Sequence, residues 1–274
     1  MAQTLTTRDT LDDFEAREVT FEGATKTVFV SGEGPAVIVM TEMPGISPHV
    51  ARFARWVREA GFTVWMPSLF GADGRVPTAE EGGKIFKRAC VSAEFRAFAG
   101  GGSSPVTLWL RKLASHAHAE CGGPGVGAIG MCFTGNFALS MMLEPSVIAP
   151  VLSQPSLPMD APDQIESPLA ETDAVRARLE AEDLTVLAYR FEGDLFCQAQ
   201  RFAAYKDALG ERFIGRVLPD SSANMSDEIT PFHAAHVTTP HSVVTVHLVD
   251  ERNEPTMKAK DEIISFFQKR LASS

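Results

Sequence analysis

One stretch of the sequence, residues 126–139, constrains the fold more than any other. It is an apolar, strand-like run that passes through a glycine-flanked cysteine directly into a helical pattern. A turn this tight between a strand and a helix strains the backbone at its central residue, so the neighbouring residues must be small. Gly130, Thr134 and Gly135 meet that demand. Residues 130–135 therefore have the pattern of a nucleophile elbow, with Cys132 at its tip.

Cys132 is a candidate nucleophile because of where this turn would place its sulfur. The start of the following helix offers backbone N–H groups and a positive dipole end, which favour a thiolate or an oxyanion. A buried structural cysteine beside a packing glycine explains an isolated G-x-C-x-x-G pattern equally well. The rest of the chain must decide between the two interpretations.

The chain alternates apolar strand-like runs with helical patterns. Runs of apolar residues such as 36–40, 126–131 and 147–152 are typical of strands buried on both faces. Ser-Pro pairs begin two of the intervening helices. We expect one α/β domain over residues 1–274, with a mostly parallel central sheet and helices on both faces. The remaining expected elements are a hairpin at about 17–32, strands at 62–66, 184–191 and 213–218, a short helix near 83–90 within an irregular substrate enclosure at 70–102, and helices at 199–209 and 255–271.

Composition excludes several classes of protein. A net charge of −10 and a pI near 5.2 argue against nucleic acid or an anionic membrane as partner. The four cysteines form no C-x-x-C pair, which argues against a zinc site and a disulfide framework and favours a reducing cytoplasm. No run approaches the length of about 18 apolar residues that a membrane span needs. We expect a soluble cytoplasmic protein without a bound metal.

A cysteine nucleophile needs a base for its proton and an acid that orients the base. After an elbow of this kind, the acid and then the histidine follow on loops after later strands. Asp194 comes just after the run 184–191 and follows a glycine that permits a sharp turn, so it is the leading acid. Glu192 and Asp220 are weaker candidates, and an exposed loop aspartate remains the plain alternative.

Seven histidines compete for the role of base. His49, His116 and His118 precede the elbow on expected helices, so the choice falls on the later histidines, which are His233, His236, His241 and His247. Position alone does not choose among them. His241 has the strongest local case, because an extended approach leads to it and an apolar segment follows it.

Four separated motifs together resemble the dienelactone hydrolase family of α/β-hydrolases. They are residues 39–45, 66–70, 130–135 and 190–194, and the resemblance extends over most of the chain from residue 36 onward. The resemblance implies an α/β-hydrolase fold without a cofactor, with Cys132 as nucleophile, Asp194 as acid and His241 as base. It also implies that the backbone N–H groups of Met43 and Phe133 form the oxyanion hole, and that Glu42 lies beside the resting thiol and gates it.

The chain departs from the family pattern in three places, and the third bears on the substrate. Thr134 replaces a frequent elbow glycine, and Ser68 replaces a frequent aspartate. The residues after His241 lack the arginine that dienelactone-specific members use for the substrate carboxylate. The candidates for replacing that arginine, which come from elsewhere in the chain, are Arg88, Arg96 and Arg201.

The resemblance implies a carboxymethylenebutenolidase-like hydrolase that acts on a small ester or lactone through an acyl-cysteine intermediate. Glutamine amidotransferases also use a cysteine elbow, but they follow it with a His-x-Glu pair, which does not occur after Cys132. The alternative from another class is a non-catalytic α/β-hydrolase scaffold that acts as a binding protein.

Overall fold

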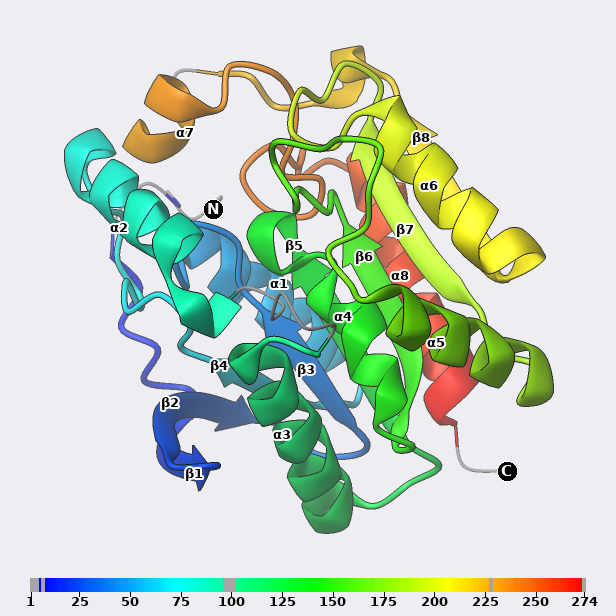
Figure 1. The fold of residues 1–274 in the computed structure, drawn as a ribbon. Helices are drawn as coiled ribbons and strands as arrows, with labels where there is room; N and C mark the ends of the chain where they lie inside the picture. Colours follow the sequence, from blue (N-terminus) through cyan, green and yellow to red (C-terminus); the bar gives the residue numbers. More distant parts are fainter. Residues whose placement is uncertain (1–4, 6–7, 96–101, 227–228, 273–274) are drawn as a thin grey trace.

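A computed structural model describes residues 5, 8–95, 102–226 and 229–272 (Figure 1). Its strands are β1 (Glu15–Phe21), β2 (Ala24–Ser31), β3 (Ala36–Met40), β4 (Thr63–Pro67), β5 (Val126–Met131), β6 (Val147–Ser153), β7 (Val186–Phe191) and β8 (Phe213–Leu218). Within the described residues these eight strands form one sheet in the order β1-β2-β4-β3-β5-β6-β7-β8. All pairs from β4 to β8 are parallel, and β1 and β2 form the predicted antiparallel hairpin.

Helices cover both faces of this sheet. Their bounds are α1 (Pro48–Glu59), α2 (Ala79–Val91), α3 (Pro105–Cys121), α4 (Phe137–Ser140), α5 (Leu169–Ala181), α6 (Ala199–Leu209), α7 (Pro231–His236) and α8 (Pro255–Leu271). In Figure 1, α3 to α6 lie in front of the sheet, and α1 and α8 lie behind it. Helices α2 and α7 pack against each other near the carboxyl ends of the strands. The predicted mostly parallel sheet with helices on both faces is thus confirmed.

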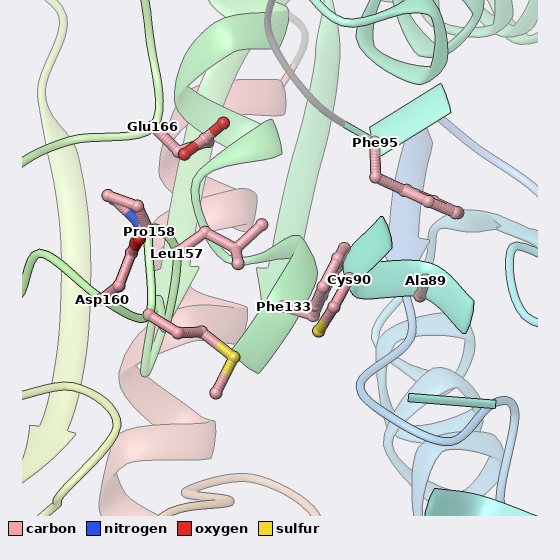
Figure 2. Close-up of a pocket in the computed structure, with 9 residues that line it drawn as sticks. Ala89, Cys90, Phe95, Phe133, Leu157, Pro158, Asp160 and Glu166 are labelled. Carbon is pink, nitrogen blue, oxygen red and sulfur yellow. The ribbon is translucent and has the colours of Figure 1, made fainter. Parts of the chain in front are cut away.

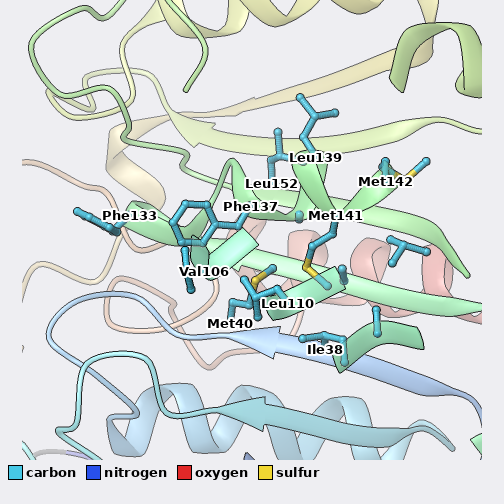
Figure 3. Packing of buried hydrophobic residues seen from close by; sticks show 14 of the residues in the cluster. Ile38, Met40, Val106, Leu110, Phe133, Phe137, Leu139, Met141, Met142 and Leu152 are labelled. Atoms are coloured by element: carbon cyan, nitrogen blue, oxygen red, sulfur yellow. The ribbon is translucent and has the colours of Figure 1, made fainter. Parts of the chain in front are cut away.

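Strand β3 shows why the sequence folds into three layers. Ile38 and Met40 point into the core formed with α3 and α4, which Figure 3 shows from close by. Val37 and Val39 point to the opposite core, which α1 and α8 complete. Because successive side chains of a strand alternate between faces, a strand covered on both sides must be apolar throughout. That pattern made the central strands recognisable in the sequence.

Two helices begin at their predicted Ser-Pro pairs. The Ser47 hydroxyl accepts a hydrogen bond from the Val50 N–H at the start of α1, and Ser104 does the same for Thr107 at the start of α3. Such caps satisfy N–H groups that have no partner inside the helix.

Two expectations need correction. The helix expected near 83–90 is longer, because Thr78 and Glu81 form a capping box that begins α2 at Ala79. The helix expected directly after Cys132 is broken: residues 132–134 form a 3-10 turn, α4 spans only Phe137–Ser140, and a second 3-10 turn ends at Leu143. Pro145 explains why the helical segment ends at Leu143. A residue that precedes a proline disfavours helical backbone geometry, and Glu144, which precedes Pro145, is extended.

None of the helices among the described residues combines the length and the apolar character that a membrane crossing requires.

Candidate active site

The backbone at Cys132 has the strained geometry that the elbow pattern predicts. Its φ is 55°, in the left-handed region that residues other than glycine rarely adopt. A Cβ on Gly130 would lie 2.1 Å from the Thr134 carbonyl oxygen, and one on Gly135 would lie 2.5 Å from Pro155 Cα. Glycine is therefore required at both positions by close backbone approach.

The two substituted motif positions carry hydrogen bonds of their own. The Thr134 hydroxyl accepts the Met131 N–H at 2.9 Å and lies 3.3 Å from the carbonyl oxygen of Met40, so it ties the elbow to the end of β3. Ser68 donates to the Asp73 carboxylate at 2.6 Å. Both departures are compatible with an intact site.

The sulfur of Cys132 contacts a residue that sequence analysis missed. Its Sγ lies 3.6 Å from Oγ of buried Ser156, whose backbone N–H donates to the Cys132 carbonyl at 3.0 Å. Ser156 follows β6, the parallel neighbour of β5, and the carboxyl ends of neighbouring parallel strands meet at one edge. That strand-end position was the only signal available in the sequence.

His241 and Asp194 form a buried pair. Nδ1 of His241 lies 2.7 Å from Oδ2 of Asp194, and both side chains are almost fully buried. The other Asp194 oxygen accepts the backbone N–H groups of Phe196 and Cys197. Burial by itself lowers the pKa of His241, but the Asp194 carboxylate and the nearby Cys132 hold it well above its usual value. Its buried Nε2 makes no well-formed hydrogen bond within the described ranges, which leaves that atom available for the thiol.

The competing histidines and acids have other contacts. His233 Nε2 lies 3.0 Å from the Ser242 hydroxyl, and His247 Nδ1 accepts the backbone N–H groups of His241 and Ser242. His236 Nε2 bonds to the Ala79 carbonyl. The Asp220 carboxylate accepts the Gly193 N–H at 2.8 Å and shapes the turn that leads to Asp194. The geometry thus favours Asp194 and His241 over their rivals.

Glu42 is completely buried just after β3, and its hydrogen bonds hold the His241 loop. Its carboxylate accepts hydrogen bonds from the hydroxyls of Ser242 and Thr245 and from the Gln154 amide. Burial raises the pKa of Glu42, and these hydroxyl donors oppose the rise. The expected contact with the thiol is not among the hydrogen bonds of the described residues. The carboxylate instead links the end of β3 to residues 242–245.

The two expected oxyanion donors lie at the site. The Met43 N–H makes no hydrogen bond within the described part of the chain, so it is free to bind a ligand. Phe133 lies in the first turn of a 3-10 helix, where N–H groups generally lack an internal partner. Met43 lines the same cavity as Cys132, and Phe133 directly follows Cys132.

Two adjoining cavities meet at this site. The first, of about 240 Å³, contains both Cys132 and His241 and is closed by residues of α2 and α7. The second, of about 350 Å³, lies against Phe133 and shares the wall residue Met159 with the first. Figure 2 shows Asp160 and Glu166 on one side of the second cavity and Phe133 and Cys90 on the other.

The candidate arginines do not line the Cys132 cavity in the described residues. Arg88 is exposed and lines a separate cavity beside Phe70. Arg201 is fully buried, and its guanidinium donates to the backbone carbonyls of Pro158 and Gln164. Arg201 therefore anchors the loop that carries Met159. Arg96 lies outside the described residues.

Known proteins resemble this chain in sequence and in fold. The family model for the dienelactone hydrolase family matches residues 23–181. No curated protein matches the sequence.

Among solved structures, the chain resembles a dienelactone hydrolase from Anabaena variabilis with 14% identity and a TM-score of 0.56, covering 94% of this chain and 98% of that one. A dienelactone hydrolase-like promiscuous phosphotriesterase from metagenomic libraries is 18% identical with a TM-score of 0.56, and the match covers 95% of this chain and 100% of that one. A soluble variant of a monoglyceride lipase from Saccharomyces cerevisiae is 10% identical with a TM-score of 0.60, and the match covers 100% of each chain. The sheet and its covering helices are those of the α/β-hydrolase fold.

Proposed function

The chain belongs to the dienelactone hydrolase family, and we propose that it hydrolyses a small ester or lactone through an acyl-cysteine intermediate without a cofactor. Membership of this family supports an ester hydrolase. The cysteine mechanism and the substrate class are the proposed parts. A cytoplasmic location belongs to the proposal as well, supported by four cysteines whose spacing shows neither a C-x-x-C pair nor a disulfide framework.

The proposed reaction has two halves. Sγ of Cys132 attacks the carbonyl carbon while the thiol proton passes to Nε2 of His241. The N–H groups of Met43 and Phe133 hold the oxyanion, which collapses to a thioester, and the departing alcohol takes the proton from His241. His241 then removes a proton from water, which attacks the thioester and releases the acid and the Cys132 thiol. Asp194 keeps the proton on Nδ1 and stabilises the imidazolium.

One observation carries this proposal: His241, which lies 2.7 Å from buried Asp194, lines the same cavity as the strained elbow cysteine. A structural cysteine needs neither a left-handed backbone nor a histidine–carboxylate pair beside it. Strain of this kind persists only where the surrounding structure enforces it, and it clusters at functional sites.

The test compares Cys132→Ala with Cys121→Ala, a change at the end of α3. We expect Cys132→Ala to reduce kcat/KM for p-nitrophenyl butyrate at least a thousandfold, as loss of a catalytic nucleophile does. Cys121→Ala should keep full activity, and circular dichroism should show both variants folded.

An active Cys132→Ala protein would refute the cysteine mechanism. Absence of turnover of any ester by the native protein, together with ester protection of Cys132 against iodoacetamide, would favour the binding-protein alternative.

A further inference from the structure

We propose that the Cys132 cavity selects esters whose buried group is uncharged and apolar, and that it rejects a group that ends in a carboxylate. This inference rests on the proposed function, because it concerns which ester Cys132 attacks. It predicts that a carboxylate-bearing dienelactone is a poor substrate of this family member.

The walls of the cavity include apolar side chains on four segments besides the loop that carries Met159. Met43 follows β3, Phe86 lies on α2, Phe196 follows Asp194, and Phe232 and Val237 belong to α7 and its end. These side chains enclose about 240 Å³ directly beside the reacting sulfur. An apolar group that enters this space leaves water for a hydrocarbon surface, which stabilises the complex by about 0.8 kcal/mol per buried methylene.

One buried polar side chain in this wall, His233, is held neutral. Its Nδ1 lies 2.8 Å from the Thr230 hydroxyl and its Nε2 lies 3.0 Å from the Ser242 hydroxyl, which in turn donates to Glu42. In the neutral ring these contacts are satisfied when Thr230 donates to Nδ1 and the Nε2–H donates to Ser242. Burial, together with nearby histidines, lowers the pKa of His233 well below its usual value. His233 therefore does not supply a positive charge to a substrate.

The charges around the cavity oppose an anionic group. The carboxylate of Glu42 lies behind Ser242, and Asp194 lies against His241 and balances the charge that His241 gains when it takes the thiol proton. The adjoining cavity presents Asp160 and Glu166 (Figure 2). A substrate carboxylate in the Cys132 cavity would lose its water among mainly apolar walls, and a buried charge without a partner costs about 3–5 kcal/mol. That cost corresponds to a hundred- to a thousandfold or more in kcat/KM.

Two adjacent glycines of α2 lie at the contact with α7, and one of them lines the cavity. A Cβ on Gly82 would lie 2.6 Å from the Phe232 ring, so Gly82 allows α2 to pack closely on α7. Gly83 lines the cavity itself, and a Cβ there would come 3.3 Å from His236 Nε2, an atom at the end of a side chain. A larger side chain at position 83 would therefore fill part of the cavity with little disturbance of the backbone.

The first test uses four p-nitrophenyl esters: butyrate, hexanoate, the adipate monoester, whose six-carbon chain matches that of hexanoate, and its uncharged methyl adipate counterpart. From butyrate to hexanoate, kcat/KM should rise about fourfold per methylene, the equivalent of the burial energy. The adipate monoester should be at least a hundredfold worse than hexanoate, and the methyl adipate ester should recover most of that loss. Equal or better turnover of the charged ester would overturn the proposal.

The second test compares Gly83→Leu with Lys84→Leu, which adds the same side chain at the next position of α2, where the lysine is 73% exposed. Gly83→Leu should lower kcat/KM for hexanoate at least tenfold more than for acetate, and Lys84→Leu should leave the ratio unchanged. An unchanged ratio in a folded Gly83→Leu protein would contradict the assignment of this cavity.

A binding measurement separates failure of this proposal from failure of the proposed function. Hexanamide and adipamic acid are compared for protection of Cys132 against iodoacetamide in the native protein, which requires no turnover. Protection by hexanamide alone supports the selectivity even if no ester is hydrolysed. Equal protection by both refutes it even if Cys132 is the nucleophile.

Discussion

Among single residues, Glu42 stands out because its carboxylate is almost completely buried. A fully buried carboxylate is costly unless hydrogen bonds satisfy it, and Ser242, Thr245 and Gln154 do so here. Ser242 directly follows His241 in the chain, and Thr245 lies in the same loop. Glu42 therefore fixes the loop that presents the base.

We predict that Glu42→Gln makes the Cys132 thiol more reactive near neutral pH, because a nearby negative charge disfavours the thiolate. The measurement is the rate of iodoacetamide alkylation of Cys132 against pH in the native and Glu42→Gln proteins. Glu192→Gln, a change of an exposed carboxylate, is the matched control and should have no effect. Superimposable profiles for Glu42→Gln and the native protein would end the idea that Glu42 gates the thiol.

The sequence made some of these residues visible and concealed others. Cys132 and Asp194 each follow an apolar strand and have glycines close by in the sequence, so local patterns identify both as candidates. His241 required the family resemblance, because four histidines shared its region of the chain. Ser156 and the partners of Glu42 depend on where loops after different strands meet, and no local pattern records that.

At the scale of elements, the elbow depends on close contact with the loop after β6. A Cβ on Gly135 would lie 2.5 Å from Pro155 Cα and 3.0 Å from the Cys132 carbonyl oxygen, and both are backbone atoms that cannot rotate away. Gly135 has a helical φ of −52°, so space and not conformation demands glycine.

We predict that Gly135→Ala destabilises the protein by about 1–3 kcal/mol through overpacking, and lowers kcat by displacing Cys132. Thermal unfolding should show a Tm lower by about 2–4 °C per kcal/mol for a chain of this size. Gly83→Ala is the contrasting change, because its new Cβ would meet a movable side-chain atom in a helix that favours alanine. A Tm for Gly135→Ala at or above that of the native protein would contradict this account.

The elements that sequence patterns predicted well are those with strong local signals. Central strands are apolar throughout, and the Ser-Pro pairs mark the starts of α1 and α3. The extent of α2 was missed because glycines at 82 and 83 weaken its helical pattern, although the capping box at Thr78 marked its start. Those glycines serve tertiary packing on α7, a relationship between residues about 150 positions apart in the sequence.

At the scale of the whole molecule, buried neutral histidines should make the protein sensitive to acid. Burial and the charge of Arg52 lower the pKa of His49 to about 4, and burial and the charge of His241 lower the pKa of His247 to about 3. Their usual pKa in an unfolded chain is about 6.5. Between these values the unfolded chain binds protons that the folded protein does not, so stability falls as the pH falls.

We predict that the free energy of unfolding decreases by about 1.4 kcal/mol per pH unit for each such histidine as the pH drops from about 6.5 toward 4. Urea unfolding at pH 7, 6 and 5 measures this slope. Asparagine at position 247 keeps an acceptor for the N–H groups of His241 and Ser242 but does not titrate. In His247→Asn the slope of the unfolding free energy against pH should therefore be smaller by the contribution of one histidine. Parallel slopes in the two proteins would refute this role for His247.

Helix α2 spans thirteen residues that help to close the Cys132 cavity, yet among them only Gly82 and Ala89 are buried. An element with so little buried apolar surface, and with two adjacent glycines in its interior, opens at a lower free energy than the sheet behind it. Its amide hydrogens should exchange with deuterated water sooner than those of β5 or β6. A substrate analogue bound in the cavity should slow that exchange, because Gly83 and Phe86 of α2 line the cavity and would contact the bound molecule.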